Sequence, residues 1–207
     1  MILKIFRSII LIFLFIISNL KAEDIISDSD YYEKGVELYK SANFSDAFII
    51  FFNLAIKDNT DAQFNLTNMY ANGIGTTKDY KEALKWSWLC ALGGEKKCIK
   101  RIQNIKSKID EKTLEKISSE VQKLLTDELY KNKNINYALK LGFWYEKFSP
   151  IIDIEKAYVW YSVSVTGGLY KAMKIRDKVE EEIETEKIIE LQAEATKIYT
   201  TVKYFVN

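Results

Sequence analysis

The chain has 207 residues, of which 48% are hydrophobic and 29% charged, so it is long enough and apolar enough to bury a core. Its 30 basic and 29 acidic residues nearly cancel, which excludes the basic footprint of a nucleic-acid-binding protein. Histidine is absent, so the commonest general base and the commonest metal ligand are both missing. We therefore expect a folded protein with no metal site, no cofactor and no nucleic-acid partner.

Residues 1–22 have the layout of a signal peptide. Lys4 and Arg7 precede an almost unbroken apolar run at 8–17, which is too short to span a bilayer comfortably, and Ala22 is the expected cleavage point. Cleavage there leaves 27 basic against 29 acidic residues, so no attraction to a membrane surface is expected of the remaining chain. An uncleaved N-terminal anchor is the alternative. In both cases we expect a periplasmic or secreted location, in an oxidising compartment.

Residues 23–58 are expected to form a first helical hairpin. Apolar residues recur at helical intervals on both sides of a short link, and so short a link forces the two helices to lie antiparallel. The intervals are similar to those of a tetratricopeptide repeat, in which small residues let the two helices cross closely. They are set by Gly35, Leu38, Ala42, Ala47 and Phe51.

Residues 59–98 predict a second hairpin, built around a turn that contains Gly73 and Gly75. These glycines can adopt the positive φ that ends a helix, and Asp79 is a good N-cap for the returning helix. The same two glycines do not indicate a phosphate-binding loop, because no strand precedes them.

This second hairpin resembles the repeat of the Sel-one-like family, a relative of tetratricopeptide repeats. Three positions depart from the family pattern: Thr67 stands in place of glycine, Glu82 in place of lysine and Ser87 in place of tyrosine. The resemblance implies an all-α solenoid of antiparallel helical hairpins whose work is binding rather than catalysis. The matching residues are Ala62, Leu66, Tyr70, Gly73, Gly75, Asp79, Ala83, Trp86 and Gly93.

An internal duplication supports this organisation independently of any family. Residues 134–172 form a second, divergent copy of the hairpin, whose turn carries Pro150 and no glycine pair. Each hairpin is followed by a charged helical extension, at 99–133 and at 173–207, which we expect to pack one apolar stripe on the stack. Equivalent residues lie 74 positions apart: Asp79 and Asp153, Ala83 and Ala157, Trp86 and Trp160, Gly93 and Gly167, Gly94 and Gly168, and in the extensions Ile105 and Val179, Ile109 and Ile183, Leu114 and Ile188, and Ile117 and Leu191.

Cys90 and Cys98 are the only cysteines, and a Gly-Gly turn lies between them. This placement can bring their Cα atoms within bridging distance, and an even number of cysteines in an exported protein indicates a disulfide. Secreted cysteine-rich relatives of the Sel-one-like family carry the same spacing, so the resemblance implies the same bridge. Two free thiols are the alternative, whereas a metal site would have too few ligands. The equivalent residues of the second copy are Ser164 and Ala172.

The four tryptophans invite a ligand-stacking interpretation. Trp86 and Trp160 fall on packing positions of the repeat, so we expect them in the core. Trp88 and Trp144 lie off that register, which leaves them free to be exposed.

In a stack of such hairpins the first helix of each hairpin lines a concave groove, which is the candidate binding site. The amide of Asn68 could there hydrogen-bond the backbone of an extended peptide. The polar and aromatic side chains expected in the groove are Tyr39, Lys40, Asn68, Asn72, Phe143 and Lys147.

These features favour an exported helical-repeat adaptor that binds a protein or peptide partner, and not an enzyme. Two alternatives stay open. One is a cell-wall or β-lactam-binding hydrolase, an activity associated with some secreted relatives; the only Ser-x-x-Lys motif, Ser18 to Lys21, falls inside the predicted signal peptide. The other is a structural accessory subunit of an envelope complex.

Overall fold

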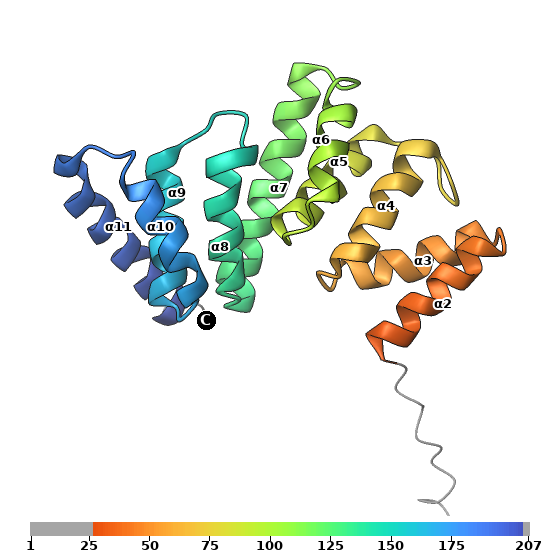
Figure 1. Cartoon of the computed structure of the whole chain (residues 1–207), viewed down its shortest axis with the longest axis horizontal. Coiled ribbons are helices and arrows are strands. Elements are labelled where there is room, and N and C mark those ends of the chain that lie inside the picture. The colour runs from red at the N-terminus through yellow and green to blue at the C-terminus, as the bar shows by residue number, and fades with distance from the viewer. Residues whose placement is uncertain (1–26, 205–207) are drawn as a thin grey trace, which may run out of the picture.

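The computed structural model describes residues 27–204, which fold into a row of helices running from α2 at one end to α11 at the other (Figure 1). Within this range no strand occurs and no helix is long and apolar enough to cross a membrane. The predicted signal peptide lies outside the described residues. The all-α prediction is confirmed. The helices are α2 (Asp28–Lys40), α3 (Phe44–Ala55), α4 (Thr60–Asn72), α5 (Tyr80–Leu92), α6 (Lys97–Lys106), α7 (Glu111–Asn132), α8 (Asn136–Phe143), α9 (Ile154–Thr166), α10 (Met173–Glu180) and α11 (Thr185–Tyr204).

Three pairs of consecutive helices pack as hairpins: α2 with α3, α4 with α5, and α8 with α9. The chain between the second and third hairpins does not form one continuous extension, because α6 and α7 are separate helices. Asp110 begins α7 by accepting a hydrogen bond from the backbone N–H of Thr113 at 2.9 Å. The C-terminal extension divides in the same way into α10 and α11, so each extension contributes two helices instead of one.

The duplication is visible in the helix boundaries themselves. α5 spans 80–92 and α9 spans 154–166, so both ends are displaced by 74 residues. α7 and α11 begin at 111 and 185, with the same displacement. The apolar stripes of the two extensions also correspond, since the equivalent residues Ile105 and Val179 are both buried. We call α4 to α7 the first unit and α8 to α11 the second unit.

The two units close their hairpin turns differently but with the same bond. The backbone N–H of Asp79 donates to the carbonyl of Tyr70 at 2.9 Å, and that of Asp153 donates to the carbonyl of Tyr145 at 3.0 Å. In the first unit Gly73 ends α4 in the left-handed conformation, with φ 71°. In the second unit the chain winds instead into a π-helical turn at Trp144–Phe148. The π-helical turn thus ends the first helix of the hairpin in the second unit, as Gly73 does in the first unit.

Trp88 and Trp144 are buried, with 1% and 0% of their surfaces exposed, so the interpretation that left them exposed is wrong. Their rings meet edge to face, 5.1 Å apart between centroids, and join α5 to the π-helical turn that follows α8. They lie off the register of their own hairpins because they face the neighbouring unit. Trp86 is buried as expected, whereas Trp160 is only half-buried.

A polar contact also crosses between distant parts of the chain. Asp58, in the turn after α3, accepts a hydrogen bond from the Tyr137 hydroxyl at 2.7 Å and pairs with the Lys140 ammonium at 2.8 Å. Both partners lie on α8, so this contact ties the N-terminal hairpin to the second unit. Burial, reinforced by the bond to Asp58, raises the pKa of the Tyr137 phenol far above its ordinary value, so the phenol stays a neutral donor.

Candidate functional site

The six residues expected in a concave groove form three local pairs. Tyr39 and Lys40 occupy the last turn of α2, where the Tyr39 ring packs edge to face on Phe44 with centroids 5.1 Å apart. Asn68 and Asn72 lie one turn apart on α4. The side-chain amide of Asn72 donates to the backbone carbonyl of Asn68 at 2.9 Å, so this side chain is partly used within its own helix.

The Asn68 side chain donates to the Phe64 carbonyl at 3.0 Å. Its Oδ1 atom is buried and has no hydrogen-bond partner among residues 27–204, so the amide keeps an unused acceptor. Asn68 therefore stays a predicted peptide contact.

The third pair lies in the second unit. Phe143 ends α8 and packs edge to face on Tyr161, with centroids 5.5 Å apart, while the Lys147 ammonium lies 5.3 Å above the Phe143 ring. Tyr161 donates a short hydrogen bond to Glu146, and burial together with that bond raises the pKa of the phenol. The cluster is well ordered by these contacts, but it is local to the turn after α8.

The structure joins Cys90 to Cys98, with their Cα atoms 6.0 Å apart. The bridge links the last turn of α5 to the first turn of α6, and both residues are fully buried. In the second unit Ser164 and Ala172 occupy the equivalent positions and are equally buried. The second unit thus keeps the packing of α9 on the following segment without the covalent link.

Removing the disulfide is expected to lower the free energy of unfolding by about 2–3 kcal/mol, because the bridge restricts a short loop of the unfolded chain. Urea unfolding of the protein with and without reductant measures the change. The double variant Cys90→Ser and Cys98→Ala copies the pair found in the second unit, and it should match the reduced protein. Equal unfolding midpoints for all three samples would contradict the expectation.

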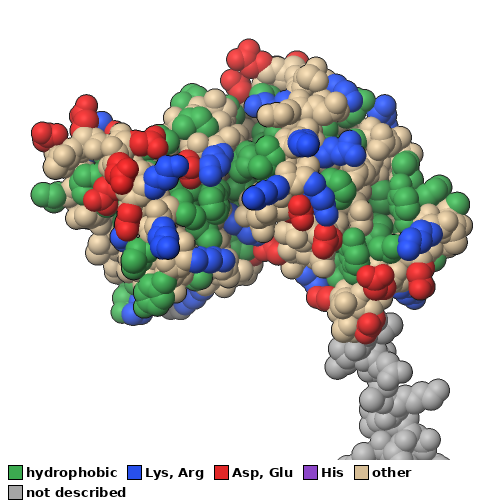
Figure 2. Space-filling view, in the orientation of Figure 1, with side chains coloured by type: hydrophobic (Ala, Val, Ile, Leu, Met, Phe, Trp, Pro, Cys, Tyr) green, Lys and Arg blue, Asp and Glu red, His purple; other side chains and the backbone are tan. Residues whose placement is uncertain are grey.

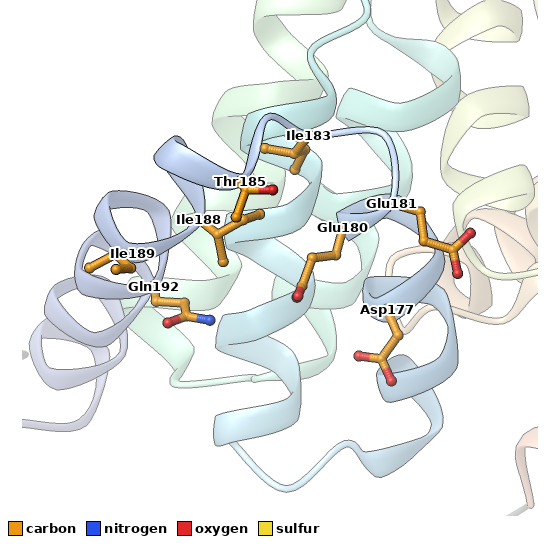
Figure 3. Close-up of a pocket in the computed structure, with 8 residues that line it drawn as sticks. All are labelled: Asp177, Glu180, Glu181, Ile183, Thr185, Ile188, Ile189 and Gln192. Atoms are coloured by element: carbon orange, nitrogen blue, oxygen red, sulfur yellow. The ribbon is translucent and has the colours of Figure 1, made fainter.

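A groove not anticipated from the sequence runs between α10 and α11, above α9. It consists of two adjoining hollows of about 400 Å³ and 410 Å³ that share Asp177, Glu180 and Gln192. In Figure 3 Asp177 and Glu180 of α10 line one side and Ile188 and Gln192 of α11 the other, while Glu181 and Ile189 lie at the outer edges. Glu180 points across the space towards α11. We call this the α10–α11 groove.

Three hydroxyl groups of α9 line the α10–α11 groove, those of Tyr158, Ser162 and Thr166. Ser162 is 8% exposed, and its Oγ atom has no hydrogen-bond partner in the described part of the chain. Four residues earlier, the Tyr158 hydroxyl accepts a hydrogen bond from the Gln192 amide at 3.3 Å. Burial raises the pKa of Tyr158, so its phenol keeps its proton at neutral pH. The groove therefore holds a buried hydroxyl, that of Ser162, for which no other residue in 27–204 provides a hydrogen bond.

The walls of the α10–α11 groove are acidic. Asp177, Glu180 and Glu181 contribute three carboxylates, and Arg176 is the one cation that lines the two hollows. The guanidinium of Arg176 is already paired with Asp177, at 2.9 Å from its Nε atom. The lining therefore carries a net charge of −2, and acidic side chains are visible over this end of the molecule in Figure 2.

Both units have a hollow at this place, since Lys106, Leu114 and Ser118 line one in the first unit, but four residues that line the α10–α11 groove are more polar than their equivalents in the first unit. Ser162 stands where the first unit has Trp88, and Trp88 is a large buried side chain. The other three exchanges have the same sense, from a buried apolar residue to a polar one. They are Leu84 to Tyr158, Leu92 to Thr166, and Ile102 to Arg176. The comparison of Trp88 with Ser162 was the sequence signal for this site.

Among residues 27–204, no group of three or more acidic, histidine or cysteine side chains is placed to hold a metal ion. Ser162 Oγ is bonded to no base there, so the groove offers no activated nucleophile. What it does offer is a set of polar and apolar contacts for a ligand.

No model of a protein family matches the sequence, and no curated protein matches it. Among solved structures the chain is similar to a Sel1 repeat protein from Oxalobacter formigenes. The two are 19% identical, the match covers 86% of this chain and 91% of that chain, and the TM-score is 0.31. The fold of the present chain is established by its own helices and their packing: residues 27–204 form an all-α array of antiparallel helical hairpins.

Proposed function

We propose that the protein is an exported helical-repeat scaffold that binds a segment of another protein in the α10–α11 groove. The observation that carries the proposal is Ser162, a buried hydroxyl that lies in an open groove and has no partner among the described residues. A buried polar group without a partner is costly, and a bound ligand that supplies the missing hydrogen bond removes that cost. Export is supported by the pattern of residues 1–22 and by the disulfide.

The shape of the groove favours a chain segment over a compact small molecule. Its two hollows adjoin through the shared residues Asp177, Glu180 and Gln192, so the site extends over both hollows. An extended peptide can lie between two helices in this way and use its backbone groups as donors and acceptors. The polar side chains Thr166, Gln192 and Thr196 supply suitable partners along the path.

Site-specific crosslinking tests the proposal. A photoreactive amino acid at Ile189, which is 77% exposed beside the groove, is expected to capture a discrete protein segment from the envelope fraction. The same group at Ile56, 60% exposed on the N-terminal hairpin, is the matched control and should not capture that segment.

Two substitutions then establish that the groove is responsible. Ser162→Trp gives the second unit the residue of the first unit, and Thr196→Trp blocks the groove from an exposed position that does not disturb the core. Both are expected to reduce capture from Ile189 at least tenfold, while Ser162→Ala leaves the groove open and reduces it less. Equal capture by a folded Thr196→Trp protein would overturn the proposal.

A further inference from the structure

We infer that the α10–α11 groove selects a segment that presents a lysine or arginine side chain. This inference rests on the proposed function and specifies the chemistry of the bound segment. It combines three observations on the groove: the unpaired carboxylates, the apolar wall beside them and the buried hydroxyl.

The carboxylates are the first observation. Glu180 and Glu181 form no ion pair within 4.0 Å among residues 27–204, and Arg176 is engaged by Asp177. A net charge of −2 repels an acidic or phosphorylated segment and attracts a cation. The first unit has Gln103, Lys106 and Ser107 at the positions of Asp177, Glu180 and Glu181, so these three carboxylates belong to the second unit alone, although Lys106 lines a hollow at the equivalent place.

The apolar wall is the second observation. Ile188 stands on α11 opposite the carboxylates of α10, and the exposed Ile189 lies beside it at the outer edge of the groove. Lysine and arginine combine a long methylene stem with a charged head, so the stem can cover the isoleucines while the head reaches Glu180. A short polar or a purely apolar side chain satisfies only one of the two walls.

The buried hydroxyl is the third observation. Ser162 Oγ can accept hydrogen bonds besides donating its own O–H, Glu180 in the same hollow accepts as well, and Glu181 adds a further acceptor in the adjoining hollow. A site rich in acceptors requires a ligand rich in donors. An ammonium group carries three N–H donors and a guanidinium five, and neither has an acceptor, so both match such a site.

A peptide array tests the inference. Immobilised nine-residue peptides of Gly and Ser, with Arg, Lys, Met, Gln or Glu at the centre, are probed with the purified chain from residue 23 on. Peptides with Arg or Lys are expected to bind at least about tenfold more strongly than those with Met, Gln or Glu. The double variant Glu180→Gln and Glu181→Gln should lose this preference. Its matched control is Glu33→Gln with Glu37→Gln on α2, which changes the net charge equally at the far end of the molecule and should keep it.

The array separates failure of this inference from failure of the proposed function. Binding that Thr196→Trp abolishes, but that shows no preference for Arg and Lys, overturns the inference and leaves the proposed function standing. A basic preference that survives Glu180→Gln with Glu181→Gln overturns the inference as well. Binding that is absent, or that Thr196→Trp does not change, overturns both.

Discussion

Replacing Trp144 by alanine is expected to lower the free energy of unfolding by about 3–5 kcal/mol. The side chain is fully buried and packs edge to face on Trp88, so its removal leaves a cavity between the two units. Trp144 belongs to the second unit and Trp88 to the first, so the substitution weakens the interface between the units. That interface makes the two units unfold cooperatively. Chemical unfolding monitored by circular dichroism measures the change.

Two further variants define the origin of this loss. Trp160→Ala is the matched control in the same unit, and it should cost less because Trp160 is only half-buried. A double-mutant cycle with Trp88→Leu and Trp144→Leu should give a coupling energy of about 0.5–1.5 kcal/mol between the rings. A cost for Trp144→Ala no greater than that for Trp160→Ala would contradict the expectation.

Gly75→Ala is expected to destabilise the protein by about 2–5 kcal/mol, through two effects that add. Gly75 has φ 70°, a conformation that alanine adopts only with strain. A Cβ atom at this position would also lie 2.7 Å from the carbonyl carbon of Phe44, which belongs to the backbone of the preceding hairpin. Backbone cannot rotate away as a flexible side chain does, so the two hairpins must separate.

Gly94→Ala separates the two effects. Gly94 also has a positive φ, 100°, but an added Cβ there meets no atom within 4 Å. Its substitution should therefore show only the conformational cost, about 1–2 kcal/mol. Thermal unfolding of both variants measures the difference, and equal midpoints would show that the contact with Phe44 has no effect.

The hairpins could be predicted from the sequence because their signals are local. Asp79 caps α5 by accepting hydrogen bonds from the backbone N–H groups of Lys81 and Glu82, and Gly73 ends α4. Small residues such as Ala62 and Ala83 are fully buried where helices cross. Each of these features is set by residues within a few positions of each other, which a single sequence displays.

The burial of Trp88 and Trp144 could not be predicted in this way. Helical periodicity identifies the face that a helix turns to its hairpin partner, but α5 also has a face buried by the next unit. That second face depends on contacts between residues more than 50 positions apart, and the register of one hairpin does not specify them.

The α10–α11 groove was missed for a related reason. Its residues come from three helices, and only the packing of these helices brings them together. The exchange of Trp88 for Ser162 at equivalent positions is the sequence signal for its buried hydroxyl, and that signal appears only when the two units are aligned. The expected concave groove, with Tyr39 and Asn68 among its residues, stays a prediction.

The missing cysteines of the second unit have a consequence for how a ligand enters. In the first unit the bridge fixes α6 against α5, whereas in the second unit Ser164 and Ala172 leave α10 held to α9 by packing alone. α10 is also the wall of the groove that carries the carboxylates. The wall can therefore swing outwards without breaking a covalent bond, and amide protons of α10 should exchange with solvent faster than those of α6. The second unit, which has no disulfide, is therefore the one in which α10 can move away from α11.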